Sequence, residues 1–219
     1  MEVGALAPYE QALRGAGPLG LHTEDGRLLT LDVARWLGAA DSADRTVLDR
    51  CRGPVLDVGC GPGRFVSELN SRGIAALGVD IAETAVALTR AQGFPALLRS
   101  VFADLPGEGR WPTVLLIDGN IGIGGDPYRL LARIGRLLAN DGQLIVETHP
   151  DPDAHDILEV RFSDGGRPVG PLFDWAHVGV AALLQYAVDA GYAGLDGWSS
   201  DGRSFVTLVR DRSRNTRRT

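Results

Sequence analysis

The 219-residue chain contains no lysine, because all 22 of its basic residues are arginine. A Schiff-base lysine and the phosphate-binding lysine of a P-loop are therefore excluded. Two cysteines, Cys51 and Cys60, cannot form a disulfide framework, and no Cys/His cluster has metal-ligand spacing, so we expect no metal. No apolar run reaches the ~18 to 20 residues of a membrane span, and the first residues lack the basic-then-apolar order of a secretory signal. We expect a cytoplasmic protein without a membrane partner.

The chain also lacks an excess of positive charge, since 28 acidic residues against 22 arginines give a net charge of −6. The last ten residues, RDRSRNTRRT, hold five Arg against one Asp, which leaves the rest of the chain at −10. An acidic body does not favour a broad nucleic-acid footprint, so no nucleic-acid partner is expected. We interpret the short basic terminus as a solvated tail. The length and the 44% hydrophobic content favour a single domain over residues 1–219.

Short apolar runs alternate with helix-like patterns from residue 55 onward, which is typical of a parallel sheet covered by helices. Strands are expected at 55–58, 75–79, 96–101, 113–117 and 144–147, and helices at 64–72, 83–92 and 127–138, the last ended by NDG at 140–142. Two final runs around SSDGR predict an antiparallel hairpin at the end of the sheet. The predicted fold class is a three-layer α/β sheet, mostly parallel, with an antiparallel C-terminal hairpin strand.

Two segments lie outside this alternation. Residues 1–50 carry helical patterns at 8–14 and 31–37, and we interpret them as a helical lid over the carboxyl ends of the strands, where open α/β sheets bind ligands. Packing against the back of the sheet is the alternative. Residues 150–173 are too long for an ordinary connection and predict a hairpin-like insertion around SDGG, followed by a helix at about 174–190.

The stretch VLDVGCGPGRF, residues 55–65, ends the first of these strands in a glycine-rich turn. A dinucleotide site needs free backbone donors facing a pyrophosphate, but Pro62 removes one donor, Arg64 stands at the third glycine position, and the Asp57 carboxylate repels phosphate. S-adenosylmethionine (SAM) carries a sulfonium and an ammonium and no phosphate. Asp57 can hold the loop amides or face this ammonium, and Asp80, at the end of the next run, can accept hydrogen bonds from ribose hydroxyls.

Together with GVDIAETAV at 78–86, this stretch resembles motif I and its successor in the class I SAM-dependent methyltransferases, over about residues 55–210. The resemblance implies a Rossmann-like fold, SAM as cofactor and S-adenosyl-L-homocysteine as product. It also implies a SAM loop at Asp57, Gly59, Gly61 and Gly63, a ribose-binding Asp80, and Ile81 packed on adenine. The family often has G-D-A-x-D-L-P after strand three. The acidic residue of that pattern bonds the adenine amino group, but SVFADLP places Val101 at its position. Adenine is therefore expected to be held by the backbone near Val101 and Phe102. Asp118 completes the cofactor-binding candidates.

The stretch LLIDGNIGIGGDP, residues 115–127, follows strand four, where the resemblance places the methyl-transfer face. Asn120 offers an amide to orient an acceptor, and DGN resembles the GN of some glycine-type N-methyltransferases. A tight loop before a helix, with Asp126 as its N-cap, is compatible with this. His149, just after strand five, is a candidate base or orienting hydrogen-bond partner. Tyr9 could close over the donor.

His177, beside Phe173 and Trp175, either lines an acceptor pocket or begins a helix. The sequence thus predicts a methyltransferase that moves a methyl group from SAM to an oxygen, nitrogen or carbon of a small-molecule acceptor. Three alternatives stay open: a SAM-fold enzyme catalysing a rearrangement or cyclisation, a non-catalytic SAM-binding partner subunit, and, disfavoured by Asp57, a dinucleotide dehydrogenase. The sequence specifies neither the acceptor nor the oligomeric state.

Overall fold

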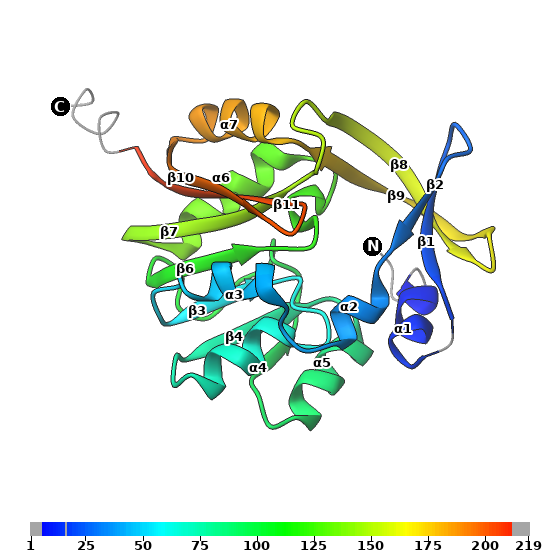
Figure 1. Ribbon diagram of the computed structural model, residues 1–219, viewed down its shortest axis with the longest axis horizontal. Helices are drawn as coiled ribbons and strands as arrows, with labels where there is room; N and C mark the ends of the chain where they lie inside the picture. Colours follow the sequence, from blue (N-terminus) through cyan, green and yellow to red (C-terminus); the bar gives the residue numbers. More distant parts are fainter. Residues whose placement is uncertain (1–5, 16, 212–219) are drawn as a thin grey trace.

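The computed structural model describes residues 6–15 and 17–211, so the Arg-rich tail from residue 212 lies outside the described residues. A seven-stranded sheet with the order β10-β11-β7-β6-β3-β4-β5 forms the centre (Figure 1). Its parallel strands are β3 (Val55–Val58), β4 (Ala76–Asp80), β5 (Ala96–Leu98), β6 (Trp111–Leu116) and β7 (Leu138–Thr148). β11 (Arg203–Arg210) runs antiparallel to β7, and β10 (Tyr192–Ser200) antiparallel to β11. The predicted fold class is confirmed.

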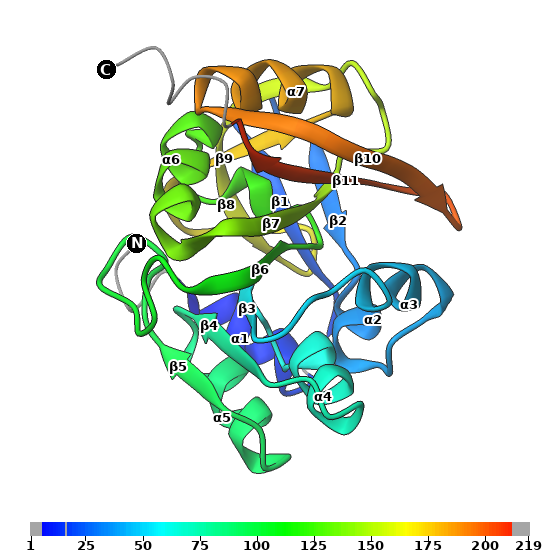
Figure 2. The same cartoon turned by 90° about the vertical axis from the view of Figure 1, so that its left-hand side faces the viewer.

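Helices cover both faces of this sheet (Figure 2). One face carries α6 (Pro127–Leu137) and α7 (Val180–Asp189), and the other carries α3 (Ser42–Leu48), α4 (Arg64–Ser71) and α5 (Glu83–Ala91). Neighbouring strand residues alternate between the two cores: Leu56 belongs to the first and Val55 to the second. This alternation follows from the period of two along a strand.

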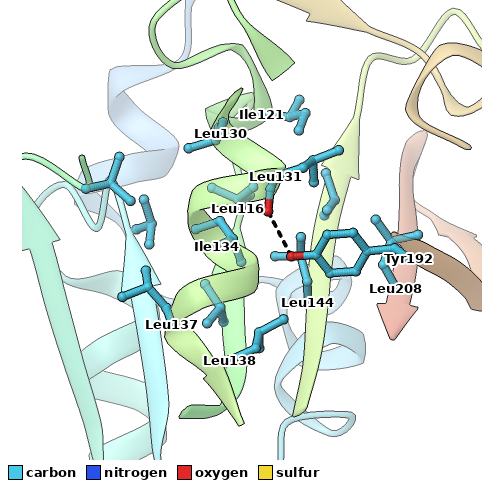
Figure 3. Close-up of a cluster of buried hydrophobic side chains, with 14 of the residues drawn as sticks. Leu116, Ile121, Leu130, Leu131, Ile134, Leu137, Leu138, Leu144, Tyr192 and Leu208 are labelled. Carbon is cyan, nitrogen blue, oxygen red and sulfur yellow. Dashed lines mark hydrogen bonds between the residues drawn. The ribbon is translucent and has the colours of Figure 1, made fainter. Parts of the chain in front are cut away.

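The α6 side of the sheet shows how the sequence builds this core (Figure 3). Asp126 caps the helix by accepting a hydrogen bond from the Arg129 N–H at 2.9 Å, and Pro127 follows at the first helical position, as predicted. The apolar stripe of α6 is fully buried against β6 and β7, and the Tyr192 hydroxyl donates to the Leu131 carbonyl at 2.9 Å. Each fully buried leucine contributes about 1.5 to 3 kcal/mol.

A second, four-stranded sheet lies beside the carboxyl ends of the parallel strands (Figure 1). Its order is β2-β1-β8-β9, with β1 (Leu19–Thr23), β2 (Leu28–Leu31), β8 (His155–Asp164) and β9 (Arg167–Val178). The β8–β9 hairpin turns at Gly165 and Gly166, whose φ angles of 54° and 82° favour glycine. One face of this sheet packs in a third core with α1 (Ala7–Leu13), α2 (Val33–Leu37) and the first turn of α5.

Besides shifted ends, such as that of β5, which ends at Leu98 rather than at residue 101, the structure differs from the predicted elements in three places. Residues 19–31 form β1 and β2, although no strand was predicted between the helical patterns at 8–14 and 31–37. The helix expected at 174–190 begins at Val180, because residues 174–178 pair with β8 and Gly179 separates strand from helix. NDG at 140–142 lies within β7, which starts directly after α6. Among the described residues, no helix is long and apolar enough to cross a bilayer.

Candidate functional site

The carboxylate of Asp80, at the end of β4, holds the glycine loop that follows β3. Its Oδ2 accepts a hydrogen bond from the Gly61 N–H at 2.9 Å, and its Oδ1 accepts from the Ala82 N–H at 2.8 Å. Burial raises the pKa of this carboxyl, and the backbone donors oppose the shift. Since each carboxylate oxygen has a second acceptor position, Asp80 retains capacity for further donors. The loop amide contact considered for Asp57 is thus made by Asp80.

The loop glycines allow close approaches that a side chain would block. Gly59, Gly61 and Gly63 have φ angles of 70°, 53° and 89°, a region that favours glycine. A Cβ at Gly59 would lie 2.5 Å from Asn120 Nδ2, and one at Gly63 would lie 2.6 Å from Thr89 Oγ1. The outer two glycines therefore permit internal packing, and the sequence folds into this tight turn because all three lack a Cβ.

Asp57 is a buried carboxylate that has no hydrogen-bond partner among residues 6–15 and 17–211. Asp57 lies in β3 and is 3% exposed, and no hydrogen bond within the described part of the chain involves its side chain. Burial, reinforced by the negative charge of Asp118 and opposed by Arg64, raises the pKa of Asp57 to about 7. Burying an ionised group without a partner is unfavourable. A cationic ligand at this point would stabilise the carboxylate, whereas a phosphate would destabilise it.

Helix α1 covers the loop through Tyr9. A Cβ at Gly61 would lie 3.4 Å from the Tyr9 hydroxyl, so the hydroxyl faces the middle glycine. The Tyr9 ring is edge-on to Trp36, with centroids 5.9 Å apart, and parallel to Phe162 at 6.5 Å. Burial, together with the charge of Asp80, raises the pKa of Tyr9 well above its usual value, which keeps the phenol protonated. Tyr9 therefore presents a neutral hydroxyl to the loop.

Two further α1 side chains fasten the helix to α5. The Glu10 carboxylate accepts hydrogen bonds from the N–H groups of Glu83 at 2.9 Å and Thr84 at 3.5 Å. Residue Ala82 at the N-cap of α5 has no side-chain acceptor, so Glu10 supplies the missing cap from another helix. The Arg14 guanidinium donates to Thr84 Oγ1 at 2.6 Å. Helix α1 is thus bound to the element that follows Asp80.

An apolar platform lies next to Asp80. Ile81 is 41% exposed and Leu98 is 49% exposed, and Leu98 pairs with Asp80 across β4 and β5. Exposed isoleucine and leucine side chains beside a carboxylate suit a flat ligand that has an apolar face and polar edges. Two backbone groups near the expected adenine position have partners within the protein: the Val101 carbonyl accepts from Arg133 Nε at 2.7 Å, and the Phe102 N–H donates to Ser100 Oγ at 3.2 Å.

Asp118 belongs to a buried ion-pair cluster at the ends of β6 and β7. With a left-handed φ of 57°, its carboxylate contacts the guanidinium groups of three arginines. The distances are 2.6 Å to Arg64, 2.9 Å to Arg35 and 3.5 Å to Arg203. Its own N–H donates to Glu147 Oε2 at 2.7 Å. Burial is the main cause that raises the pKa of Asp118. The charge of Asp118 reaches the loop, but its oxygens are bound to arginines.

Arg203 joins this cluster from β11. Its guanidinium donates to both Glu147 oxygens at 2.8 Å and to Asp44 Oδ1 at 2.7 Å. These hydrogen bonds raise the pKa of Arg203 although burial opposes them. Sequence reasoning missed the cluster, because its members are spread from Arg35 to Arg203 with no common spacing. The available signal was a charged residue inside an apolar pattern, at Glu147 near the end of a buried strand and at Arg64 in a helix start.

Asn120 and His149 have different surroundings. Asn120 Nδ2 donates to the carbonyls of Val58 at 2.9 Å and Gly59 at 3.0 Å, so this amide shapes the loop. His149 Nδ1 accepts a hydrogen bond from the Asp151 N–H at 3.1 Å, and its ring stacks on His177 with centroids 5.0 Å apart. Because the Nδ1 lone pair is occupied, neutral His149 carries its proton on Nε2. His149 in this geometry is a hydrogen-bond donor rather than a base.

The structure therefore brings Tyr9, Asp57, Gly61, Asp80 and Asn120 together around one loop. His149 has other partners, near the start of the β8–β9 hairpin. An open cavity of about 550 Å³ lies elsewhere, at the amino ends of the parallel strands, where Arg52, Asp141 and Arg210 contribute to its lining. It is separate from the loop. The arrangement around the loop favours a positively charged ligand with a flat apolar part.

Comparison with known proteins supports the same interpretation. A family model described as a methyltransferase domain matches residues 34–167, which include β3, the glycine loop, Asp80 and Asp118. None of the curated protein sequences matches this chain significantly.

Several solved structures have a similar fold. A SAM-dependent methyltransferase from Bacteroides fragilis, in complex with S-adenosyl-L-homocysteine, has a TM-score of 0.74 and 19% identity, covering 95% of this chain and 93% of that one. The sugar N-methyltransferase KedS8 from a Streptoalloteichus species has a TM-score of 0.58 and 19% identity, covering 80% of this chain and 87% of that one. A 1,6-didemethyltoxoflavin-N1-methyltransferase from Burkholderia thailandensis has a TM-score of 0.55 and 19% identity, covering 71% of this chain and 70% of that one. The Bacteroides fragilis structure matches nearly the whole chain, which confirms the predicted Rossmann-like methyltransferase fold.

Proposed function

The chain belongs to the methyltransferase domain family, and we propose that it transfers a methyl group from SAM to a small-molecule acceptor. The observation that carries the proposal is Asp57, a buried carboxylate without a hydrogen-bond partner among the described residues, beside the glycine loop. An ammonium would satisfy this carboxylate, and a pyrophosphate would be repelled by it. The similar Bacteroides fragilis structure was determined with S-adenosyl-L-homocysteine, the product of such a transfer.

In this proposal, each residue around the loop would bind a different part of the donor. Asp57 would face the ammonium, and Asp80 would accept hydrogen bonds from ribose hydroxyls while it holds Gly61. Ile81 would pack on adenine, with Leu98 beside it. Tyr9 would cover the bound molecule and exclude water. When bound, SAM supplies an electrophilic methyl group on its sulfonium, so the protein contributes mainly positioning and desolvation.

The two acceptor-side candidates, Asn120 and His149, have different roles in this proposal. Asn120 keeps the glycine loop in shape through the Val58 and Gly59 carbonyls. His149 would orient the acceptor through Nε2–H, since its Nδ1 is already bound to the Asp151 N–H. Within the predicted lid segment, α1 would cover the donor, whereas α3 packs on a face of the central sheet. Residues 150–173 would shape the acceptor site, within one domain over residues 1–219. Two similar structures are a sugar N-methyltransferase and a 1,6-didemethyltoxoflavin-N1-methyltransferase, which supports a small-molecule acceptor. The cytoplasmic location stays a prediction.

Calorimetric titration with SAM, S-adenosyl-L-homocysteine and NAD tests the donor. We expect SAM to bind and NAD not to bind. Asp80→Asn should weaken SAM binding about tenfold to a hundredfold, because it removes a charge-assisted acceptor worth roughly 1.5 to 3 kcal/mol. The matched control is Asp189→Asn, on the exposed side of α7, which should leave the affinity unchanged.

Tight NAD binding without a SAM signal would contradict the proposal. Release of S-adenosyl-L-homocysteine in the presence of an acceptor separates methyl transfer from a rearrangement on the same fold. An Asp80→Asn variant with unchanged SAM affinity and a normal melting curve would show that Asp80 does not bind the ribose.

A further inference from the structure

Strand β9 presents a row of ring-bearing side chains to the interior. Phe173, Trp175 and His177 alternate along the strand, so they lie on the same face of the second sheet. All three are half-buried. Phe173 and Trp175 pack in the same core as Tyr9 and Trp36, which places this face toward α1 and α2 rather than toward solvent.

Direct contacts connect this row to the glycine loop on two sides. On one side the Trp175 indole lies against the short helix η2 (Asn120–Gly122), where a Cβ at Gly122 would lie 2.9 Å from Trp175 Nε1. Asn120, in the same helix, holds the Gly59 carbonyl. The short helix η2 therefore connects this row of side chains to the glycine loop.

The other side runs through aromatic rings. Phe173 packs on Phe162 with ring centroids 5.1 Å apart, and Phe162 lies parallel to Tyr9 at 6.5 Å. The Tyr9 hydroxyl faces Gly61. Since both connections end at the loop where the donor is proposed to bind, this face of β9 would form a wall beside the donor.

The two histidines at the end of this wall differ in what their rings can do. The lone pair of His149 is bound to the Asp151 N–H, whereas no hydrogen bond among the described residues involves the His177 ring. Burial, and then the nearby His149, lower the pKa of His177. Of the other charged groups that face it, Asp156 on β8 opposes this shift and Arg27 in the β1–β2 turn adds to it. At neutral pH, His177 is the uncharged imidazole with a free lone pair.

We propose that β9 is the acceptor wall of the enzyme, on which a planar aromatic acceptor lies against Trp175 and Phe173 and gives its proton to His177. This inference rests on the proposed function. Two aromatic side chains stack on a flat ring but offer a sugar only one polar group, the indole N–H. The O–H or ring N–H bond of the acceptor breaks, and the proton goes to a His177 nitrogen. The freed electron pair bonds the methyl carbon, and the methyl–sulfur pair stays on sulfur, which releases S-adenosyl-L-homocysteine.

The test uses the full chain with SAM and two sets of probes: phenol, 1-naphthol and 8-hydroxyquinoline as planar acceptors, and glucosamine and glycine as saturated ones. Binding is measured by quenching of tryptophan fluorescence with S-adenosyl-L-homocysteine present, and turnover by its release from SAM. We expect planar probes to bind and to be methylated. Trp175→Ala should raise their KM about two- to tenfold through lost stacking. The control Trp198→Phe, whose ring stacks on Phe205 in the other sheet, should leave KM unchanged.

His177→Asn should lower kcat at neutral pH by roughly 10²- to 10⁴-fold, with SAM affinity and melting temperature near wild type. The rate should recover as the pH approaches the pKa of the acceptor, because an acceptor that ionises unaided needs no base. His177→Gln is the second variant if the first folds poorly. His155→Asn, which removes a surface histidine bonded to Tyr186, is the matched control and should keep full activity.

Three results would overturn the inference. They are binding and turnover of saturated probes only, failure of every planar probe to bind to a protein that binds SAM, and a large pH-rescued loss in His149→Asn with normal turnover in His177→Asn. Absence of SAM binding would instead overturn the proposed function, so the two failures are distinguishable.

Discussion

Replacing Asp57 with asparagine should stabilise the ligand-free protein and weaken its donor site in the same variant. The carboxyl has a pKa of about 7 in the folded chain, mainly through burial, against about 3.9 when unfolded. Below about pH 4 it is protonated in both states and imposes no penalty. As the pH rises from about 4 to about 7 the unfolded state loses this proton first, so the folded state is progressively disfavoured, and the penalty is complete above about 7.

The magnitude follows from the shift. About three pKa units, at 1.36 kcal/mol each, give up to about 4 kcal/mol of destabilisation at pH 8. Asparagine is nearly isosteric and never ionises, so Asp57→Asn should recover much of this free energy at pH 8 and less at pH 5. The same variant cannot neutralise an ammonium, which should weaken SAM binding about tenfold to a hundredfold. In the wild type, SAM affinity should fall about tenfold per pH unit below 7, because the free carboxyl must first lose its proton.

Urea denaturation at pH 5 and pH 8 measures the first effect, and calorimetric titration with SAM at both values measures the second. Asp189→Asn, at an exposed position of α7, controls for the loss of one surface charge and should change neither quantity. The reasoning is refuted if Asp57→Asn is no more stable than the wild type at pH 8. It is also refuted if wild-type SAM affinity does not change between pH 5 and pH 8.

Two other perturbations test the surroundings of the site. Arg203→Met should lower the free energy of unfolding by about 3 to 5 kcal/mol in urea denaturation, because Glu147 and Asp44 lose a buried partner. Arg27→Ala, which removes a pair with both side chains more than half exposed, should change it by less than about 1 kcal/mol, and equal changes in the two variants would contradict the assignment. Glu10→Ala removes the cap of α5 and should weaken the docking of α1 by about 0.5 to 2 kcal/mol, seen in stopped-flow as about 2- to 30-fold faster SAM release. An unchanged release rate would show that α1 does not retain the donor.

Elements set by local pattern were predicted well from the sequence. β3 has the predicted bounds, and α4, α5 and α6 begin at the predicted residues, because apolar period, capping residues and glycines are local signals. β1 and β2 were missed because β1 finds its partner in β8, far along the chain, and a run such as LGLHT has little periodicity. His177 was placed at a helix start for the same reason, since only pairing with β8 makes residues 174–178 a strand.

The candidate site was predicted in composition more than in arrangement. The motif located the loop and the acids Asp57 and Asp80, but the sequence could not decide which acid holds the loop amides. That depends on how β3 and β4 place their last residues, which is a tertiary property. Asp118 was found for its position after β6, while its three arginine partners come from α2, α4 and β11. Long-range charge pairing leaves no mark at fixed spacing.

The pairing of β1 with β8 also sets an order of events during synthesis. Leu19 pairs with Asp164 and Thr23 with Val160, so the second sheet joins segments about 140 residues apart. At roughly 5 to 20 residues per second, a ribosome takes about 7 to 30 s to make the missing partner after β1 has emerged. During that interval β1 and β2 have at most each other to pair with, and an isolated two-stranded hairpin is marginally stable. The central strands β3 to β7 are complete before β8 exists. The acceptor wall therefore assembles only after the central parallel strands have been made, and the nascent chain exposes an unpaired edge of β1 until then.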